Sequence, residues 1–521
     1  MSETDRLYRA TAVMAAGTAL SRITGLGRVM ALTFALGVTG TRLADTYSLA
    51  NTTPNIIFEL FLGGVFTAVF VPVLVEIRTR SQDASPLVST SLLVLAAVSA
   101  MTAIAAPLVM RIYTFRIADP QVRAEVLDLA SFLLRWFSPQ IFFYGLSAIA
   151  EALLNVRRRF GPPKFAPVLN NLIAIATLLV FAQAFGQRGL DLGLGAKTLL
   201  GAGTTAGVVL QAIVLVPMLR GEGLRFRPSL SDAGVRRVLR LSVFVVGYVV
   251  VNQAGLWFVL ALATRVVGGV TAYQIAFMFL QLPHGLFAVS LISALLPDLA
   301  SAAQRRDWVG YRRSLAHGIR GVAYLLLPAA VGYWLLAEPI TRLLLVRGVA
   351  GARDAALVAG VLRAFAVGLV FFSLFQLLTR SFYALQDTRS PMLLNALAVG
   401  IHTIVNVPLF AWLGVRGLAY GHAIAYAVGS VALLSALHTR IGGLGLREHV
   451  PALVRIGVGT AVMGVGVAAA DALIGEGDVV RTVVAVGVGA VLYLSFSQVA
   501  GVPERRILLP RVGSEREEQA P

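Results

Sequence analysis

The chain has 521 residues, of which 57% are apolar and only 13% are charged. A soluble domain carries roughly 25% charged residues, so this composition excludes a string of soluble domains and indicates a protein embedded in lipid. Lys and Arg outnumber Asp and Glu by 44 to 26, and positive loops beside a membrane explain that excess better than nucleic-acid binding. The lack of cysteine excludes disulfides and thiol chemistry.

Fourteen stretches are long and apolar enough to cross a bilayer, which needs about 20 residues per helix. Their approximate limits are 10–37, 43–75, 87–112, 125–154, 165–187, 197–219, 238–265, 271–300, 316–338, 353–385, 392–414, 417–438, 451–474 and 480–500. The sequence therefore predicts an all-α integral membrane protein with about 14 transmembrane helices.

Basic residues between these stretches predict the orientation. With the N-terminus in the cytoplasm, 24 basic residues lie in inner segments and 12 in outer connections. Both termini are then cytoplasmic, and the polar segment 501–521 is predicted to be a disordered tail. Dispersed carboxylates, six scattered His and no H-E-x-x-H motif argue against an enzyme, a bound metal or a cofactor.

Two pairs of stretches repeat at nearly one offset. The end of the fourth stretch and the end of the tenth share aromatic pairs and a following proline at a shift of about 228, which aligns Pro163 with Pro391. The second and eighth stretches, each bracketed by prolines, repeat at about 225. Six spans separate each pair, so the copies share one orientation. We expect two six-helix lobes related by a parallel pseudo-two-fold axis around a cleft, a plan for alternating access.

This duplication predicts the domain limits. Residues 1–228 form an N-lobe with helices 1–6, and residues 229–450 form a C-lobe with helices 7–12. Residues 451–500 add helices 13 and 14, which are rich in Gly, Ala and Val. Such small residues favour close helix packing, and the alternative is a shallow apolar groove for a lipid tail.

Charged residues inside spans are costly and are therefore functional candidates. Arg22 and Arg28 lie six residues apart in the first span, with Gly25 and Gly27 between them to permit a bend. Arginine suits bidentate capture of phosphate oxygens, so the pair is a candidate site for an anionic, phosphate-bearing ligand. The alternatives are snorkelling and a charge pair with an acidic neighbour.

Acidic and amide side chains in neighbouring spans add further candidates. Asp45 and Glu59 in the second span are candidates for gating or for a charge pair with a first-span arginine. Amides in the second and eighth spans mark the expected cleft, although any one of them also suits an interhelical hydrogen bond. The candidate substrate contacts among these amides are Asn51, Asn55, Gln274 and Gln281.

The sequence resembles the MurJ/MviN family of lipid II flippases, within the multidrug/oligosaccharidyl-lipid/polysaccharide exporter superfamily. The matching segments are S-R-I-T-G-L-G-R, A-D-T-Y-S-L-A-N-T-T-P-N, G-G-V-F-T-A-V-F-V-P-V-L-V-E and S-F-Y-A-L-Q-D-T-R-S-P. The resemblance implies a V-shaped pair of lobes, a cationic cavity and a groove for a polyprenyl tail beside the last two helices. It also implies transfer of undecaprenyl-diphosphate-linked disaccharide pentapeptide to the outer leaflet of the bacterial plasma membrane, for cell-wall synthesis.

The resemblance carries over to particular residues. Arg22 and Arg28 match the first-span arginines of the family, and Asp45 matches the acidic residue that opens the second span. Asp387 and Thr403 lie in a region where relatives bind ions, so they are a candidate ion site. Coupling to membrane potential, Na⁺ or H⁺ and contacts with other cell-wall synthesis proteins are also implied.

Three positions depart from the family pattern. Phe58 and Glu59 stand where members carry an arginine pair, and Met278 replaces a cavity arginine. The cavity is therefore predicted to be less cationic than in those members. Two alternatives to lipid II transport follow: export of another lipid-linked glycan or amphipathic compound, and a non-transporting scaffold for cell-wall proteins.

Overall fold

The computed structural model describes residues 3–60, 69–80, 82–157, 159–186, 189–221, 223–474 and 477–507. Contacts divide the chain into two compact units. Unit 1 comprises Met1–Thr271 with Leu345–Asp354, and unit 2 comprises Ala272–Leu344 with Ala355–Pro521. Helices α11 (Gly269–Pro283) and α13 (Trp308–Leu345) each continue across a boundary of these units.

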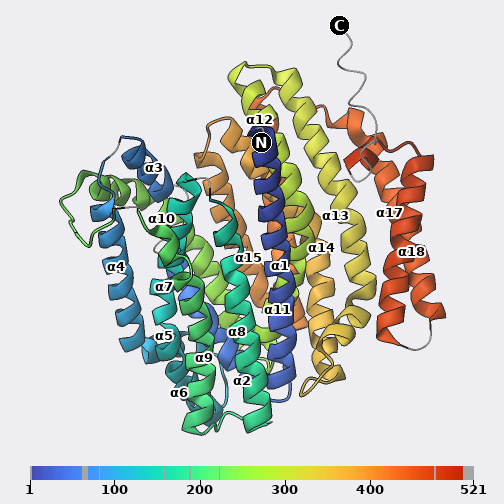
Figure 1. Ribbon diagram of the computed structural model, residues 1–521. Coiled ribbons are helices and arrows are strands. Elements are labelled where there is room, and N and C mark those ends of the chain that lie inside the picture. Colours follow the sequence, from blue (N-terminus) through green and yellow to red (C-terminus); the bar gives the residue numbers. More distant parts are fainter. Residues whose placement is uncertain are drawn as a thin grey trace. The chain divides into compact units, whose positions relative to one another are not determined.

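Unit 1 is built from helices that run along one another (Figure 1). Its elements are α1 (Glu3–Leu36), α2 (Leu43–Phe58), α3 (Val71–Thr79), α4 (Ser85–Ile104), α5 (Ala106–Thr114), α6 (Pro120–Phe137), α7 (Pro139–Val156), α8 (Gly161–Phe185), α9 (Leu194–Ile213), η3 (Val216–Leu219) and α10 (Ala233–Ala263). Helix α1 packs along α8, and α8 packs along α9.

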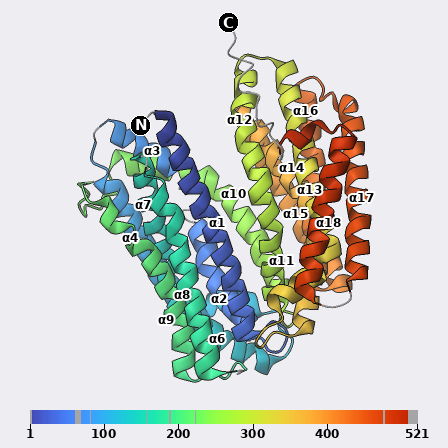
Figure 2. The same ribbon diagram turned by 45° about the vertical axis from the view of Figure 1, so that its right-hand side comes forward.

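Unit 2 contains the remaining helices, with α17 and α18 as a neighbouring pair (Figure 2). Its elements after α11 are η4 (His284–Ala288), α12 (Val289–Gln304), α13, α14 (Ala352–Ala384), α15 (Arg389–Leu413), α16 (Val415–Arg440), η5 (Leu446–His449), α17 (Val450–Leu473), α18 (Asp478–Val499) and η6 (Pro503–Ile507). Helix α15 packs along α16.

Where the structure describes them, the fourteen predicted stretches coincide with helical segments, and the protein is an all-helical membrane protein. In the described part, twelve segments are long and apolar enough to cross a membrane. The other two predicted stretches, 43–75 and 238–265, correspond to α2 with α3 and to α10. Residues 61–68 of the first of these lie outside the described residues.

Proline interrupts two spans that the sequence predicts as single helices. The stretch 87–112 is divided between α4 and α5 at Ala105, just before Pro107, and the stretch 125–154 is divided between α6 and α7 at Ser138, just before Pro139. Proline lacks the N–H that would continue the helical hydrogen-bond ladder, whereas Ser138 itself keeps helical backbone, with φ −53° and ψ −40°. Hydropathy alone does not register such a break.

Helix limits repeat along the chain. Helix α8 runs from Gly161 to Phe185 and α15 from Arg389 to Leu413, so both limits shift by 228 residues. Backbone with π-helical bonding begins at Glu59 in the second stretch and at His284 in the eighth, a shift of 225. These offsets equal those found in the sequence and support the duplication.

The segment after α18 differs from the expected disordered tail where the structure describes it. Residues Pro503–Ile507 form η6. Glu504 is 4% exposed and accepts a hydrogen bond of 2.6 Å from Arg320 Nε on α13, whose Nη1 lies 2.8 Å from His449 Nδ1. This ion pair fastens the end of the helical region to unit 2. Residues 508–521 lie outside the described residues.

Candidate functional site

Helix α1 carries both candidate arginines and is unbroken from Glu3 to Leu36. The bend that Gly25 and Gly27 would permit does not break the helix. Asn171 on α8 donates to Ser21 O and Thr24 Oγ1, both at 3.1 Å, which fixes this part of α1 against α8. Arg22 and Arg28 are each half-buried, so their side chains remain accessible within a membrane helix.

Arg28 acts at a distance on a series of polar contacts inside unit 1. It acts electrostatically on Tyr144 of α7, whose hydroxyl donates to Gln140 Oε1 at 3.4 Å. Gln140 in turn donates to Thr205 Oγ1 at 3.2 Å. The ring of Tyr144 lies 6.0 Å from that of Phe58. Phe58, one of the departures from the family pattern, therefore packs against the tyrosine on which Arg28 acts electrostatically.

Helix α2 presents a line of polar side chains at helical spacing. Asn51, Asn55 and Glu59 follow one another at intervals of four residues, which places them on one face. Asn55 and Glu59 are exposed, and the enclosed Oδ1 of Asn51 has no hydrogen-bond partner in the described structure. Polar side chains exposed in the middle of a span are typical of a water-filled path.

Asp45 is buried and its carboxylate is saturated by hydrogen bonds. Oδ2 accepts from Gly268 N at 2.8 Å, while Oδ1 accepts from Thr271 N at 2.9 Å and from Thr271 Oγ1 at 2.8 Å. Arg42 acts on the same carboxylate and donates from Nη1 to Thr264 O at 2.6 Å. The partners of Asp45 are thus the start of α11 and Arg42, and the connection before α2 is tied to the one before α11.

A second buried carboxylate ties the same region to the connection before α14. Asp354, 4% exposed, accepts from both Thr39 N and Thr39 Oγ1 through Oδ1, and from Gly351 N through Oδ2 at 2.7 Å. The backbone adds a bond from Val349 N to Phe34 O of 3.0 Å. Three connections that are distant in sequence therefore meet at one end of unit 1.

The candidates in unit 2 lie at different places. Gln274, Met278 and Gln281 follow one another on α11, with Gln281 exposed and the other two half-buried. Thr403 donates to Val399 O within its own helix at 2.9 Å. Asp387 precedes α15, so about 21 Å of helix separates it from the level of Thr403. The two candidate ion ligands therefore do not come together.

Asp387 caps a helix and closes an ion pair. Its Oδ1 accepts from Arg389 N and Ser390 N, both at 3.0 Å, and Oδ2 accepts from Ser390 Oγ at 2.7 Å and Arg440 Nη1 at 2.5 Å. Burial raises the pKa of Asp387, but the Ser390 hydrogen bonds and the Arg440 charge outweigh burial. The net pKa is below its usual value of 3.8.

An apolar cavity of about 400 Å³ lies between α13, α17 and α18 in unit 2. Its lining includes Pro328, Gly332, Met463, Val467 and Tyr493. The Gly-rich helices at the C-terminus thus leave open space beside α13, in addition to packing against each other through Gly459 and Gly466.

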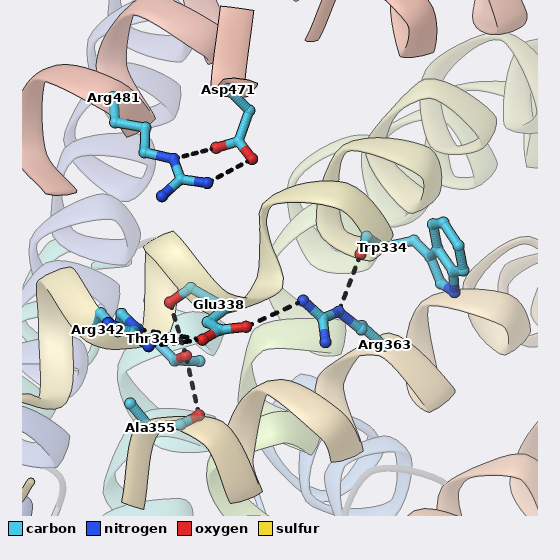
Figure 3. Close-up of polar contacts among 8 residues, drawn as sticks. All are labelled: Trp334, Glu338, Thr341, Arg342, Ala355, Arg363, Asp471 and Arg481. Atoms are coloured by element: carbon cyan, nitrogen blue, oxygen red, sulfur yellow. Dashed lines mark hydrogen bonds and ion pairs between the residues drawn. The ribbon is translucent and has the colours of Figure 1, made fainter. Parts of the chain in front are cut away.

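Ion pairs cluster on the helices that form this cavity (Figure 3). Glu338 on α13 bonds Arg342 at 2.8 Å and Arg363 on α14 at 3.5 Å. Asp471 at the end of α17 holds Arg481 of α18 in a bidentate pair of 2.5 and 2.7 Å. Figure 3 shows the two clusters near each other, and Glu338 acts electrostatically on Arg481. These pairs fix α17 to α18 and α13 to α14.

Sequence reasoning missed three residues of these sites. The sequence analysis predicts no site role for Tyr144, Gln140 or Thr271. Their signal is weak in the sequence, because Tyr144 is followed by an ordinary apolar helix and Thr271 lies 226 residues from the carboxylate that it binds. Only the folded chain brings them to Arg28 and Asp45.

Comparisons with known proteins place this architecture. Residues 34–487 match the family described as "Lipid II flippase MurJ". The chain is 33% identical over 430 residues to a probable lipid II flippase MurJ of Rhizobium tropici, covering 81% of this chain and 79% of the relative. It is 29% identical to the lipid II flippase MurJ of Burkholderia cenocepacia, covering 85% and 84%.

Solved structures show the same fold. A lipid II flippase MurJ in an inward closed conformation superposes with a TM-score of 0.77 at 20% identity, covering 95% of this chain and 99% of that one. An inward-facing multidrug resistance MATE family transporter gives a TM-score of 0.67 at 14% identity, covering 81% and 95%. The fold is therefore that of MurJ and MATE transporters.

Proposed function

The chain belongs to the MurJ family of lipid II flippases, and we propose that Arg22 and Arg28 bind the diphosphate of lipid II during its transfer from the inner to the outer leaflet. Its fold and its family make it a multi-pass membrane transporter of peptidoglycan synthesis and not an enzyme. Transfer proceeds by alternating access, in which the binding site opens to one side of the membrane at a time.

The observation that carries this proposal is the half-buried position of both arginines on α1. Asn171 holds the intervening turn of α1 against α8, so the two guanidinium groups project from a fixed support. Arginine in a membrane helix is retained at a high energetic cost, and a diphosphate offers the bidentate acceptor that guanidinium recognises best. Asn51 and Asn55 on the polar face of α2 supply hydrogen bonds to the glycan or peptide, as do Gln274 and Gln281 in unit 2.

The departures from the family pattern fit this role. Phe58 packs against Tyr144, which keeps the tyrosine beside Arg28, while exposed Glu59 stands two turns beyond Asn51. We propose that the tyrosine hydroxyl takes part of the hydrogen bonding that an additional arginine provides in relatives. Arg22 and Arg28 then bind one diphosphate with fewer positive charges around it than the family pattern provides.

The apolar cavity beside α13 suits the polyprenyl tail of the substrate. Its lining is almost wholly aliphatic and aromatic, with Gly332, Met463 and Val467 among its walls, and about 400 Å³ lies within the range of ligand pockets. The tail would stay in this apolar environment while the charged headgroup crosses by the polar path.

Asp45 suits the role of a gate. Its three hydrogen bonds to Gly268 and Thr271 hold the connections before α2 and α11 together, and they must separate for that end of the path to open. With the excess of basic residues on the inner side, this end faces outward and both chain termini lie in the cytoplasm. Cell-wall synthesis proteins that consume the substrate outside the membrane are the expected partners.

Complementation tests the arginine role. A strain depleted of its own lipid II flippase receives the wild-type gene, the Arg22→Ala/Arg28→Ala double variant, or the Arg236→Ala/Arg240→Ala variant as a matched control. Arg236 and Arg240 are exposed on α10. We expect growth with the wild type and the control but not with the α1 variant at equal membrane abundance. Full growth with the α1 variant would remove the arginines from the mechanism.

Mass spectrometry of lipid bound to the purified protein tests the cargo. Recovery of lipid II from the wild type, reduced in the α1 double variant, supports the proposal. Recovery of a different lipid-linked glycan in its place would favour a related exporter. If arginine variants and Asp45 variants were all silent while loop variants abolished growth, a scaffold role would be the better explanation.

A further inference from the structure

Two polar side chains on α10 have no part in the site described above. Gln253 and Trp257 lie four residues apart, a spacing that places them on one face of the helix. That face borders the exposed Val250 and Ala254 and lies opposite the buried Gly255. The pair therefore belongs to the open face of α10 and not to the face that is buried by packing within unit 1.

The polar atoms of this pair are enclosed and lack hydrogen-bond partners in the described structure. They are Gln253 Oε1 and Trp257 Nε1, and Asn51 Oδ1 on the polar face of α2 is in the same state. Buried polar atoms are normally paired, because an unpaired one loses its bonds to water without replacement. These three atoms therefore point to a ligand that pairs with them.

Asn51 lies at the same level of unit 1 as the α10 pair. Arg42 Nη1 donates to Thr264 O at 2.6 Å, which joins the N-cap of α2 to the C-cap of α10. Both helices extend from this anchor at 1.5 Å per residue. Asn51 is about 13.5 Å along α2, and Trp257 and Gln253 are about 10.5 and 16.5 Å along α10. The height of Asn51 thus falls between those of the pair.

The chemistry of the three side chains fits a neutral ligand rich in hydroxyl groups. An amide offers both a donor and an acceptor, and an indole offers one donor at the edge of a large apolar ring. Sugar hydroxyls and acetamide groups also donate and accept, and the C–H face of a sugar packs on an aromatic ring. A phosphate offers acceptors without donors, so it cannot pair with an amide oxygen. A hard cation prefers oxygen ligands and cannot use the indole N–H.

The position of these residues along α2 agrees with a glycan that follows a diphosphate. Arg28 acts electrostatically on Tyr144, whose ring lies 6.0 Å from that of Phe58. Asn51 precedes Phe58 by seven residues, or about 10 Å of helix. In a lipid-linked glycan the first sugar is bonded directly to the diphosphate. A diphosphate held by Arg28 therefore has its sugars within reach of this level of α2.

We propose that Asn51, Gln253 and Trp257 form a subsite for the glycan of the lipid-linked substrate, an inference that rests on the proposed flippase function. The two amides bond sugar hydroxyls or an acetamide group. The indole ring covers the apolar face of one sugar while its Nε1 donates to an oxygen. A site built to bond polar groups discriminates strongly against a ligand that lacks them. The subsite therefore favours the glycan-bearing lipid over the bare prenyl diphosphate.

Binding of three lipids with the same tail to the purified full chain tests this preference. They are undecaprenyl diphosphate, the same lipid carrying the disaccharide without the peptide, and lipid II, each titrated by native mass spectrometry. We expect the disaccharide to raise affinity at least about tenfold, the effect of two or three hydrogen bonds. Equal affinity for the first two lipids would overturn the proposal, as would a gain that appears only with the peptide. This reading needs only the wild-type protein.

Two variants assign the preference to α10. Trp257→Phe removes the indole N–H but keeps an aromatic ring, and Gln253→Leu removes the amide. Each should lower the preference for the disaccharide roughly three- to tenfold. Affinity for undecaprenyl diphosphate should stay unchanged, which also shows that the variant is folded. Trp412→Phe makes the same change at a side chain that is 81% exposed on α15 and should keep the wild-type preference. An unchanged preference in both α10 variants would contradict the subsite.

Failure of the subsite and failure of the proposed function give different results. If the wild type binds all three lipids with equal affinity, the glycan subsite is wrong and the flippase function stands. If it binds none of them, both fall together. The Arg22→Ala/Arg28→Ala variant should weaken all three lipids by a similar factor and keep the preference for the disaccharide, because different residues recognise the diphosphate and the glycan.

Discussion

A disulfide across the Asp45 contact tests whether that contact must open. Thr271 Oγ1 lies 3.4 Å from Ser48 Oγ, and both residues are buried. Cysteine replaces a hydroxyl by a thiol at the same branch point, so Ser48→Cys/Thr271→Cys places two sulfur atoms within bonding reach after a small adjustment. The chain has no cysteine of its own, so the pair has no competing partner.

The stabilisation follows from the length of chain that the bond encloses. Residues 48 and 271 bound a loop of about 220 residues, for which the chain-entropy model gives about 5 kcal/mol less any strain in the native state. Both forms of the variant lack the Thr271 hydroxyl bond to Asp45, which costs roughly 1 kcal/mol or more against the wild type and cancels between the two forms. The oxidised variant should therefore unfold at a higher temperature than its reduced form.

The functional result separates a gate from a static contact. If these connections part during each cycle, flipping of lipid II in proteoliposomes falls to the fraction of protein that remains reduced, and dithiothreitol restores it. Ser229→Cys/Ser231→Cys, whose hydroxyls lie 3.0 Å apart in one exposed connection, is the control cross-link and should leave flipping unchanged. Equal rates for oxidised and reduced Ser48→Cys/Thr271→Cys would refute the gating role of Asp45.

Three further outcomes follow from the contacts above. The pKa of Asp387 is lowered in the fold. Its contribution to stability is therefore full above about pH 4 and is lost as the pH falls through the folded pKa. In thermal unfolding, Asp387→Asn should lower stability at pH 7 and have little effect in acid. Gly332→Leu places a side chain in open space within the apolar cavity and should slow flipping in proteoliposomes without unfolding the protein. Gly487→Leu, the control, also enters open space but lies outside the cavity lining, and it should leave the flipping rate unchanged. Gly421→Ala, whose β-carbon would overlap Asn406 Oδ1, should cost roughly 1–3 kcal/mol by overpacking, read as a lower unfolding midpoint in nanodiscs.

The membrane spans could be predicted from the sequence because lipid imposes a simple rule: about 20 apolar residues per crossing. The internal repeat was also readable, since prolines at helix ends fix the backbone and persist at a constant offset, as Pro163 and Pro391 do. The interruptions within spans could not be predicted, because the breaks at Ala105 and Ser138 depend on backbone geometry within stretches of unchanged hydropathy.

The site was predictable only as a set of residue types. Arg22 and Arg28 stand out because charge is rare inside spans, but their neighbours Tyr144 and Gln140 are ordinary in an apolar helix. Asp45 stands out for the same reason as the arginines. Its partners, Gly268 and Thr271, cannot be predicted, because they bind it largely through backbone N–H groups that almost every residue possesses.

The two copies of the repeat share the limits of α8 and α15 but differ in the polar residues that these helices carry. With the shift of 228 that relates α8 to α15, Ala174 and Leu178 stand in α8 where His402 and Asn406 stand in α15. Shared packing therefore does not explain the polar pair on α15, since both positions are apolar in α8. The first copy carries Arg22 and Arg28, the proposed contacts of the anionic headgroup. Alternating access requires that cargo bound in the first copy be felt by the second, and the Asp45 hydrogen bond to Thr271 N holds the start of α11, a helix that continues from unit 1 into unit 2.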